Sequence, residues 1–205
     1  MRLAMADVQT LFVTKLYRAA VEGVRNDELL RACKGIAAED AAGRRWSKGK
    51  GYRGYTSYAS LNDLPKRDPS IAALKTALDK HAAAFAKALH LELSGRKLKL
   101  DSLWINVLEP GGTHSGHIHP HSVLSGTYYV DVPPGASALK LEDPRLPLMM
   151  AAPPRREDAP EEERSFVYVS PRAGEVLMWE SFVRHEVPPN AAKRARISVS
   201  FNYGL

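Results

Sequence analysis

The alternation of hydrophobic and polar positions predicts one long helix in the first half of the chain, between Asp68 and Leu91. Asp68 can cap the first turn, and Pro69 suits that turn because its missing backbone N–H is not needed there. Many alanines in the stretch support a helix. The apolar residues that recur at helical spacing are Ile71, Leu74, Leu78, Phe85 and Leu89.

A second apolar stripe predicts a helix over residues 26–42, with Asn26 as its N-cap and Gly43 as its end. Residues 43–66 are rich in Gly, Ser, Tyr and Lys, which predicts a long loop. Residues 5–19 fit either a short strand followed by a helix or one amphipathic element. The pattern leaves both alternatives for this segment open.

After Gly95 the pattern changes to β, with many short alternating segments, turn residues between them and no interleaved helices. This predicts an antiparallel sandwich or barrel. The chain is therefore expected to be one α+β domain, in which a mainly helical support region (1–95) packs on a β-rich core (96–205). Strands are predicted near residues 97–100, 103–108, 117–119, 124–132, 138–142, 165–169, 175–179 and 195–203. The first two segments are either two strands or one strand interrupted by a bulge.

Residues 144–164 interrupt the β-rich half with a run of prolines and charged side chains. Such a sequence cannot form a regular strand and predicts a loop insert that leaves the barrel. The insert lies between two histidine-bearing segments, so it is either a tolerated loop or a lid over a site.

Composition narrows the class of protein. The chain has 205 residues, 44% of them hydrophobic and 25% charged, which suits one globular domain. No apolar run approaches the roughly 20 residues that span a bilayer, and the start does not read as a secretory signal. Cys33 is the only cysteine. A cytoplasmic protein without a membrane partner is expected.

The net charge of +6 could attract nucleic acid or an acidic ligand. The densest basic stretch, residues 43–53, also contains aromatic side chains. The charge is otherwise spread along the chain, and this stretch is better explained as a solvated loop. Nucleic acid is therefore disfavoured as a partner.

Histidines cluster in the β-rich half, where His114, His117, His119 and His121 lie within eight residues. His117 and His119 are two positions apart, so on a strand their side chains point to the same side. Imidazole suits Fe, Zn, Cu and Ni, and His185 supplies a third candidate ligand. His114 and His121 are candidates for groups around the metal or facing a substrate.

The last predicted strand alternates between apolar and polar side chains, with Arg196 and Ser198 on its polar face. A polar inward face is unusual in a core strand and favours a ligand pocket over packing. Guanidinium can form a two-pronged pair with a carboxylate, so Arg196 is a candidate for binding an acidic co-substrate, with Arg194 as an alternative.

Five motifs together resemble the 2-oxoglutarate- and Fe(II)-dependent oxygenases, and in particular a bacterial branch of that family. The resemblance covers roughly residues 100–205 and implies a double-stranded β-helix, also called a jelly roll, of cupin type. The motifs are His117-Ile118-His119-Pro120, Leu124-Ser125-Gly126-Thr127-Tyr128-Tyr129-Val130, Asp143-Pro144-Arg145, His185-Glu186-Val187-Pro188-Pro189-Asn190 and Arg196-Ile197-Ser198.

The resemblance implies that His117, His119 and His185 bind Fe(II). His119 stands where the wider superfamily has a carboxylate, which leaves one more positive charge on the site; His119 could also turn away. The resemblance further implies that Arg196 and Ser198, with Tyr129 and Asn106, hold the co-substrate 2-oxoglutarate. From the residues alone, Tyr129 could instead be a core residue and Asn106 a turn anchor.

The implied activity is that of an oxidoreductase: a dioxygenase that hydroxylates a small-molecule or peptide substrate and releases succinate and CO2. Two alternatives remain open. The first is a cupin-type three-histidine dioxygenase that does not use 2-oxoglutarate, and the second is a non-catalytic metal-binding barrel. The sequence does not indicate the substrate or the oligomeric state.

Overall fold

The computed structural model describes residues 6–205 and shows two antiparallel sheets that enclose a polar pocket. The larger sheet has the order β1 (Tyr17–Ala20), β8 (Glu175–Glu180), β5 (Leu124–Asp131), β10 (Arg196–Gly204), β3 (Lys99–Leu108) and β2 (Gly54–Thr56). The smaller sheet has the order β4 (His114–His117), β9 (His185–Val187), β6 (Leu139–Glu142) and β7 (Phe166–Val169). The α+β class and the double-stranded β-helix core are as predicted.

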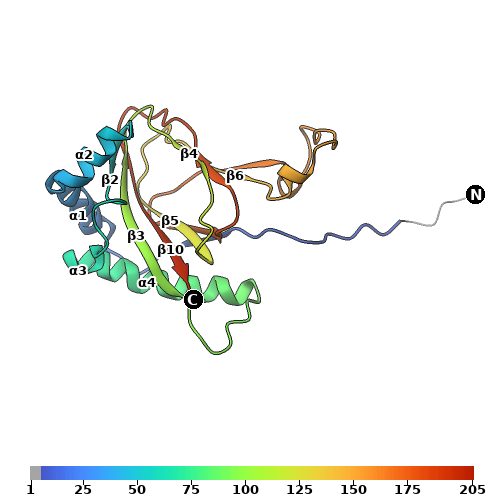
Figure 1. The fold of residues 1–205 in the computed structure, drawn as a ribbon, viewed down its shortest axis with the longest axis horizontal. Helices are drawn as coiled ribbons and strands as arrows, with labels where there is room; N and C mark the ends of the chain where they lie inside the picture. The colour runs from blue at the N-terminus through green and yellow to red at the C-terminus, as the bar shows by residue number, and fades with distance from the viewer. Residues whose placement is uncertain (1–5) are drawn as a thin grey trace, which may run out of the picture.

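The helices lie together beside the larger sheet (Figure 1) and share its main apolar core. They are α1 (Asn26–Glu39), α2 (Ala41–Gly49), α3 (Leu64–Arg67) and α4 (Pro69–Ala88). Leu74 and Phe85 of α4 belong to the same buried cluster as Val199 and Phe201 of β10. Because β10 presents its apolar side chains to the helices, its polar side chains are left facing the other sheet.

The long helix α4 follows the sequence prediction closely. Asp68 is its N-cap and accepts a hydrogen bond from the backbone N–H of Ser70 at 2.8 Å, and Pro69 occupies the first turn. The helix ends at Ala88, three residues earlier than expected.

The prediction for residues 26–66 is wrong in part. Helix α1 is preceded by Arg25 as its N-cap; the Asn26 side chain instead bonds to the Val130 carbonyl and the Tyr128 hydroxyl. Gly43 does not end a helix, because Asp40 caps a new one, α2, and accepts a hydrogen bond from the Gly43 N–H. The segment expected to be a loop thus contains α2, β2 and α3.

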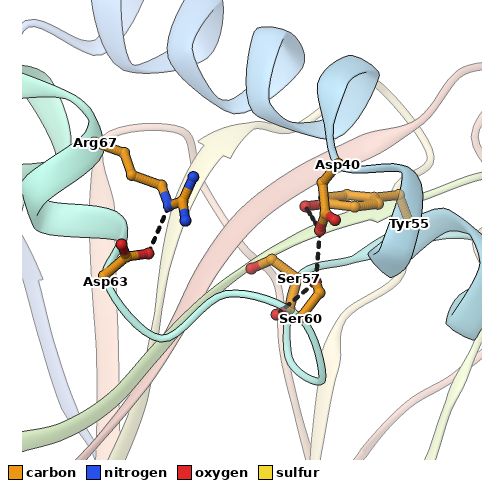
Figure 2. A network of polar contacts seen from close by, with 6 residues as sticks. All are labelled: Asp40, Tyr55, Ser57, Ser60, Asp63 and Arg67. Carbon is orange, nitrogen blue, oxygen red and sulfur yellow. Dashed lines mark hydrogen bonds and ion pairs between the residues drawn. The ribbon is translucent and has the colours of Figure 1, made fainter.

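A polar network ties α2 to the turn after β2 (Figure 2). The Asp40 carboxylate accepts hydrogen bonds from the hydroxyls of Tyr55 and Ser60. Gly43 permits this close approach, since a Cβ there would lie 2.3 Å from an Asp40 carboxylate oxygen. The network fixes the turn at residues 57–60, which carries Tyr58 against Trp104, a residue that lines the pocket.

The two alternatives for residues 5–19 are both replaced by a simpler arrangement. Tyr17–Ala20 pairs with β8 as an edge strand, and no helix follows within this segment. Residues 6–16 have no regular structure and run away from the body of the protein (Figure 1). Residue 5 lies outside the described residues.

The insert at residues 144–164 connects β6 to β7, which pair with each other, and projects from the sheets (Figure 1). It contains only two short 3-10 turns, so the absence of a strand in this stretch is confirmed. Within residues 6–205, every helix is too short or too polar to cross a membrane.

Candidate metal centre and pocket

The pocket is built from cross-strand rows on the inner face of the larger sheet. Residues that face each other across antiparallel strands project to the same side. From the Arg196 end of β10 onward, the rows drawn from β5, β10 and β3 are Tyr129–Ser198–Asn106, then Thr127–Ser200–Trp104, then Ser125–Asn202–Ser102.

All seven site residues predicted from the sequence line this one pocket. The larger sheet contributes Arg196 and Ser198 from β10, and the smaller sheet contributes His185 from β9. The complete set is His117, His119, His185, Arg196, Ser198, Tyr129 and Asn106.

Three histidines converge at one side of the pocket. Each of His117, His119 and His185 offers a ring nitrogen, and these nitrogens lie within 4.8 Å of one another. His117 and His185 are direct partners in the β4–β9 ladder, with ring centres 4.4 Å apart. His119 follows β4, and its backbone N–H donates to the Ser181 carbonyl at 3.0 Å. This geometry fits a metal ion held by three imidazoles.

Backbone carbonyls orient two of these rings. His185 Nδ1 lies 3.0 Å from the Val183 carbonyl oxygen, and His117 Nδ1 lies 2.7 Å from the Ser115 carbonyl oxygen. A proton on each Nδ1 satisfies these contacts and leaves Nε2 free as the ligand atom.

Burial keeps two of the rings in the form that binds a metal. Burial, with a smaller effect of the neighbouring histidines, lowers the pKa of His185 to about 3 and that of His119 to about 4. Both imidazoles are therefore neutral at pH 7. Neutral imidazole is the form that coordinates a metal, so neither ring must lose a proton first.

The two other histidines of the cluster differ in burial and in their position relative to the pocket. His114 lines the pocket, and its Nε2 lies 2.9 Å from the Tyr52 hydroxyl. Burial, with a smaller effect of the Arg196 charge, lowers the pKa of His114 to about 3. His121 is exposed and does not line the pocket. Tyr52 was not predicted; its only sequence signal was its position in the basic, aromatic stretch 43–53.

Arg196 lies toward the opposite end of the inner face of β10 from Asn202. Its side chain is buried, with 2% of the residue exposed, and Nη1 donates to the Ser137 carbonyl at 3.0 Å. Burial lowers the pKa of Arg196, and no carboxylate among residues 6–205 pairs with it. Arg194, the alternative, is exposed, pairs with Asp131 and lies outside the pocket lining.

Several buried polar atoms around the pocket have no protein partner. They include Arg196 Nε, Asn106 Oδ1 and Trp179 Nε1. Trp179, which the sequence analysis missed, lies with its ring centre 4.7 Å from that of His185. Buried polar groups are nearly always hydrogen-bonded, so this cluster indicates a polar ligand in the pocket.

The fold and the pocket define a class: a double-stranded β-helix protein in which three converging histidines, a candidate metal centre, share a pocket with a buried arginine. Residues 102–202 match the family model described as "Putative 2OG-Fe(II) oxygenase". This match, over just under half of the chain, together with the fold supports the family of 2-oxoglutarate- and Fe(II)-dependent oxygenases, and an enzyme of that class.

Solved structures of such enzymes share the fold. The epimerase SnoN, solved with Fe3+, alpha-ketoglutarate and nogalamycin RO, is 17% identical over 93% of this chain and 79% of its own, with a TM-score of 0.64. HygX from Streptomyces hygroscopicus, with nickel, 2-oxoglutarate and hygromycin B, is 16% identical over 94% and 83%, with a TM-score of 0.59. A Pseudomonas putida prolyl-4-hydroxylase is 16% identical over 94% of both chains, with a TM-score of 0.54. No curated protein matches the sequence.

Proposed function

We propose that the protein binds Fe(II) through His117, His119 and His185 and hydroxylates a C–H bond of an organic substrate at the expense of 2-oxoglutarate. The proposal assigns the distal carboxylate of 2-oxoglutarate to Arg196 and Ser198. Tyr129 and Asn106 complete this end of the co-substrate site.

The observation that carries the proposal is that Arg196 is buried without a carboxylate partner. A buried guanidinium without a carboxylate partner is costly, because its charge has lost water without gaining an anion. Arg196 opens into the same pocket as the three histidines. A dicarboxylate that reached from the metal to Arg196 would neutralise this charge and satisfy the unpartnered Nε.

The donor set fits Fe(II), although it departs from the usual two histidines and one carboxylate of the superfamily. His119 converges with His117 and His185, which supports its role as the third ligand. Glu186 also lines the pocket, but it pairs with Lys140 at 2.7 Å. Three neutral imidazoles leave the full charge of the metal to be balanced by the doubly negative co-substrate.

When bound, iron and 2-oxoglutarate supply the oxidative chemistry: O2, 2-oxoglutarate and a C–H bond give succinate, CO2 and a C–OH group. The chain's own residues bind, orient and exclude water. Arg196 and Ser198 would hold the distal carboxylate of the co-substrate, and the three histidines would hold the metal. Leu139 and Trp179 are buried beside the pocket and keep water from this region.

Two rival functions remain to be separated by experiment: a three-histidine dioxygenase that does not use 2-oxoglutarate, and a non-catalytic metal-binding barrel. Either rival would have been favoured by an Arg196 far from the histidines or paired with an internal carboxylate. Arg196 lines the same pocket as the histidines, and it pairs with no carboxylate among the described residues.

The deciding experiment is an anaerobic titration of the Fe(II)-loaded protein with 2-oxoglutarate, followed by visible absorption. A saturable charge-transfer band would establish chelation of 2-oxoglutarate by the iron. Bound iron without such a band would reject the proposal and favour one of the two rivals. Succinate is a useful control ligand, because it carries the distal carboxylate but cannot chelate through a 2-oxo group.

A further inference from the structure

We infer that the substrate is an aromatic compound whose ring packs against Tyr58 and Trp104 at the histidine end of the pocket. This inference rests on the proposed function, since it takes the Arg196 end to be occupied by 2-oxoglutarate.

The inner face of β10 gives the pocket a direction. Arg196 and Asn202 are six residues apart on the same face, which corresponds to about 20 Å along the strand. His119 lies at the Asn202 end, with Nδ1 3.4 Å from the Asn202 amide nitrogen and a ring centre 6.0 Å from that of Trp104. With 2-oxoglutarate at the Arg196 end, the side of Trp104 and Asn202 is left for the substrate.

Two exposed aromatic side chains lie next to this end. Tyr58 is 59% exposed and packs against Trp104, and Phe182 is 52% exposed. Phe182 follows Ser181, whose carbonyl accepts the His119 N–H. Large apolar side chains that remain in water next to a pocket indicate a surface that a ligand covers.

Tyr58 and Trp104 form an edge-to-face aromatic pair beside His119. Their ring centres are 5.3 Å apart and the planes meet at 73°. Trp104 lines the pocket, whereas Tyr58 is open to solvent. A third ring can add to such a pair in the offset or edge-to-face geometries that aromatic rings prefer.

The turn that carries Tyr58 is held in place. The backbone of Ser57 bonds to the Ile105 carbonyl, and the Ser57 hydroxyl accepts from the Ile105 N–H at 3.0 Å. Ser60 bonds to Asp40 in the network of Figure 2. A preorganised aromatic side chain loses little conformational freedom on binding, which favours its use as a ligand contact.

Most polar groups at this end are already paired with one another, so they have little left to offer a polar substrate. Asn202 donates to Ser102 at 3.0 Å and accepts from Ser125 at 2.8 Å, and Ser125 also bonds to Ser181. Of the unpartnered buried polar atoms among residues 6–205, those of Asn106, Ser137 and Arg196 lie toward the Arg196 end, whereas Trp179 Nε1 belongs to a ring 4.7 Å from that of His185. Apart from Trp179 Nε1, recognition at the histidine end is thus left to apolar and aromatic contact.

Two probes of similar size test the inference: benzyl alcohol, which carries an aromatic ring, and cyclohexylmethanol, which carries a saturated one. Binding of each to the Zn(II)- and 2-oxoglutarate-loaded protein is measured by saturation-transfer difference NMR, which needs no turnover. Benzyl alcohol should bind more tightly than cyclohexylmethanol, and Tyr58→Ala should weaken benzyl alcohol about 2- to 10-fold.

Tyr168→Ala is the matched control, because Tyr168 is 57% exposed but lies on β7 outside the pocket lining. It should leave binding of both probes unchanged. Equal binding of the two probes would overturn the aromatic class, and equal effects of Tyr58→Ala and Tyr168→Ala would overturn the location. A protein that fails to bind Zn(II) or 2-oxoglutarate would instead reject the proposed function, which the loading step measures separately.

Discussion

The guanidinium carbon of Arg196 lies 5.6 Å from the centre of the Tyr129 ring. Tyr129 is also the cross-strand partner of Ser198, so all three residues meet at one end of the pocket. The ring can stabilise the buried cation only in part, since a cation–π contact is weaker than pairing with a carboxylate. The buried positive charge of Arg196 is therefore left to pair with an anion that does not belong to the chain.

Replacing Arg196 with Ala is expected to weaken 2-oxoglutarate binding about 10- to 100-fold, because a charge-assisted pair worth roughly 1.5–3 kcal/mol is lost. Metal binding should remain stoichiometric. Calorimetric titration of the Zn(II)-loaded variant with 2-oxoglutarate measures the effect. Arg194→Ala is the control, since Arg194 lies two residues away and is paired with Asp131 at the surface.

If Arg196→Ala bound 2-oxoglutarate as tightly as the wild type does, the co-substrate would have to bind at another place. If Arg194→Ala weakened binding equally, the effect would be one of general surface charge. Arg196→Lys adds a further test, because Lys keeps the charge but lacks the two-pronged guanidinium. We expect its affinity to lie between those of the wild type and Arg196→Ala.

Replacing His185 with Ala should abolish stoichiometric binding of the metal, because two imidazoles remain where three converge. Metal content after dialysis, measured by mass spectrometry, checks this. His121→Ala is the control, since His121 belongs to the same sequence cluster but is exposed and outside the pocket. Full iron content in the His185 variant would show that the ligand assignment is wrong.

Replacing His119 tests the departure from the usual ligand set. His119→Asp supplies a carboxylate, a common iron ligand, and should retain more metal than His119→Ala. If both variants held iron as the wild type does, His119 would not be a ligand. The same metal measurement serves for both variants.

Local patterns made much of this structure predictable. Helix α4 was predicted because its spacing, its cap and its first proline all lie within one stretch of sequence. The convergence of His117 and His119 followed from their spacing, although the strand itself ends at His117 and His119 is placed by a bond to Ser181. The polar face of β10 followed from alternation, and the pairing of β10 with β3 and β5 preserved it.

Long-range contacts account for what was missed. Tyr52 reaches His114 from the segment between α2 and β2, and Trp179 reaches His185 from β8. The turn after β2 brings Tyr58 against Trp104. Likewise, the sequence pattern predicts a helix end at Gly43, whereas in the structure Asp40 caps a second helix there. The single-domain organisation and the role of the 144–164 insert as a lid remain predictions.

Gly126, in the middle of β5, is expected to tolerate no larger residue. A Cβ there would lie 2.5 Å from the Phe201 ring and 2.7 Å from the Leu177 carbonyl oxygen. Gly126→Ala should therefore lower the free energy of unfolding by about 1–3 kcal/mol, as overpacking in a core does. Urea unfolding of the metal-free protein measures it.

The contrasting variant is Gly35→Ala. Gly35 lies within α1, and a Cβ there would meet nothing within 4 Å. This change should raise the free energy of unfolding by about 0.5–1 kcal/mol, because alanine favours the helix and restricts the unfolded chain. Equal effects of the two substitutions would contradict the close contact assigned to Gly126.

Asp40 should make the free energy of unfolding depend on pH in the acidic range. Burial alone would raise the pKa of its carboxyl group, but hydrogen bonds from Ser60, Gly43 and Tyr55 outweigh this and lower it below the ordinary value of 3.8. A carboxyl group with a lowered folded-state pKa binds fewer protons in the folded than in the unfolded protein at acidic pH. Its contribution is therefore present above about pH 4 and is lost as the pH falls through the lowered pKa.

Asp40→Asn should reduce the free energy of unfolding by about 1–2 kcal/mol at pH 7, since the amide cannot accept all three hydrogen bonds. The difference from the wild type should shrink below pH 4, which urea unfolding at pH 7, 5, 4 and 3 would show. Asp63→Asn is the control, because the Asp63–Arg67 pair in Figure 2 is solvent-exposed and contributes little. A difference that stayed constant down to pH 3 would mean that the Asp40 charge does not stabilise the turn.

Because this turn carries Tyr58, Asp40→Asn should also weaken benzyl alcohol binding if the turn must be held rigid to present the ring.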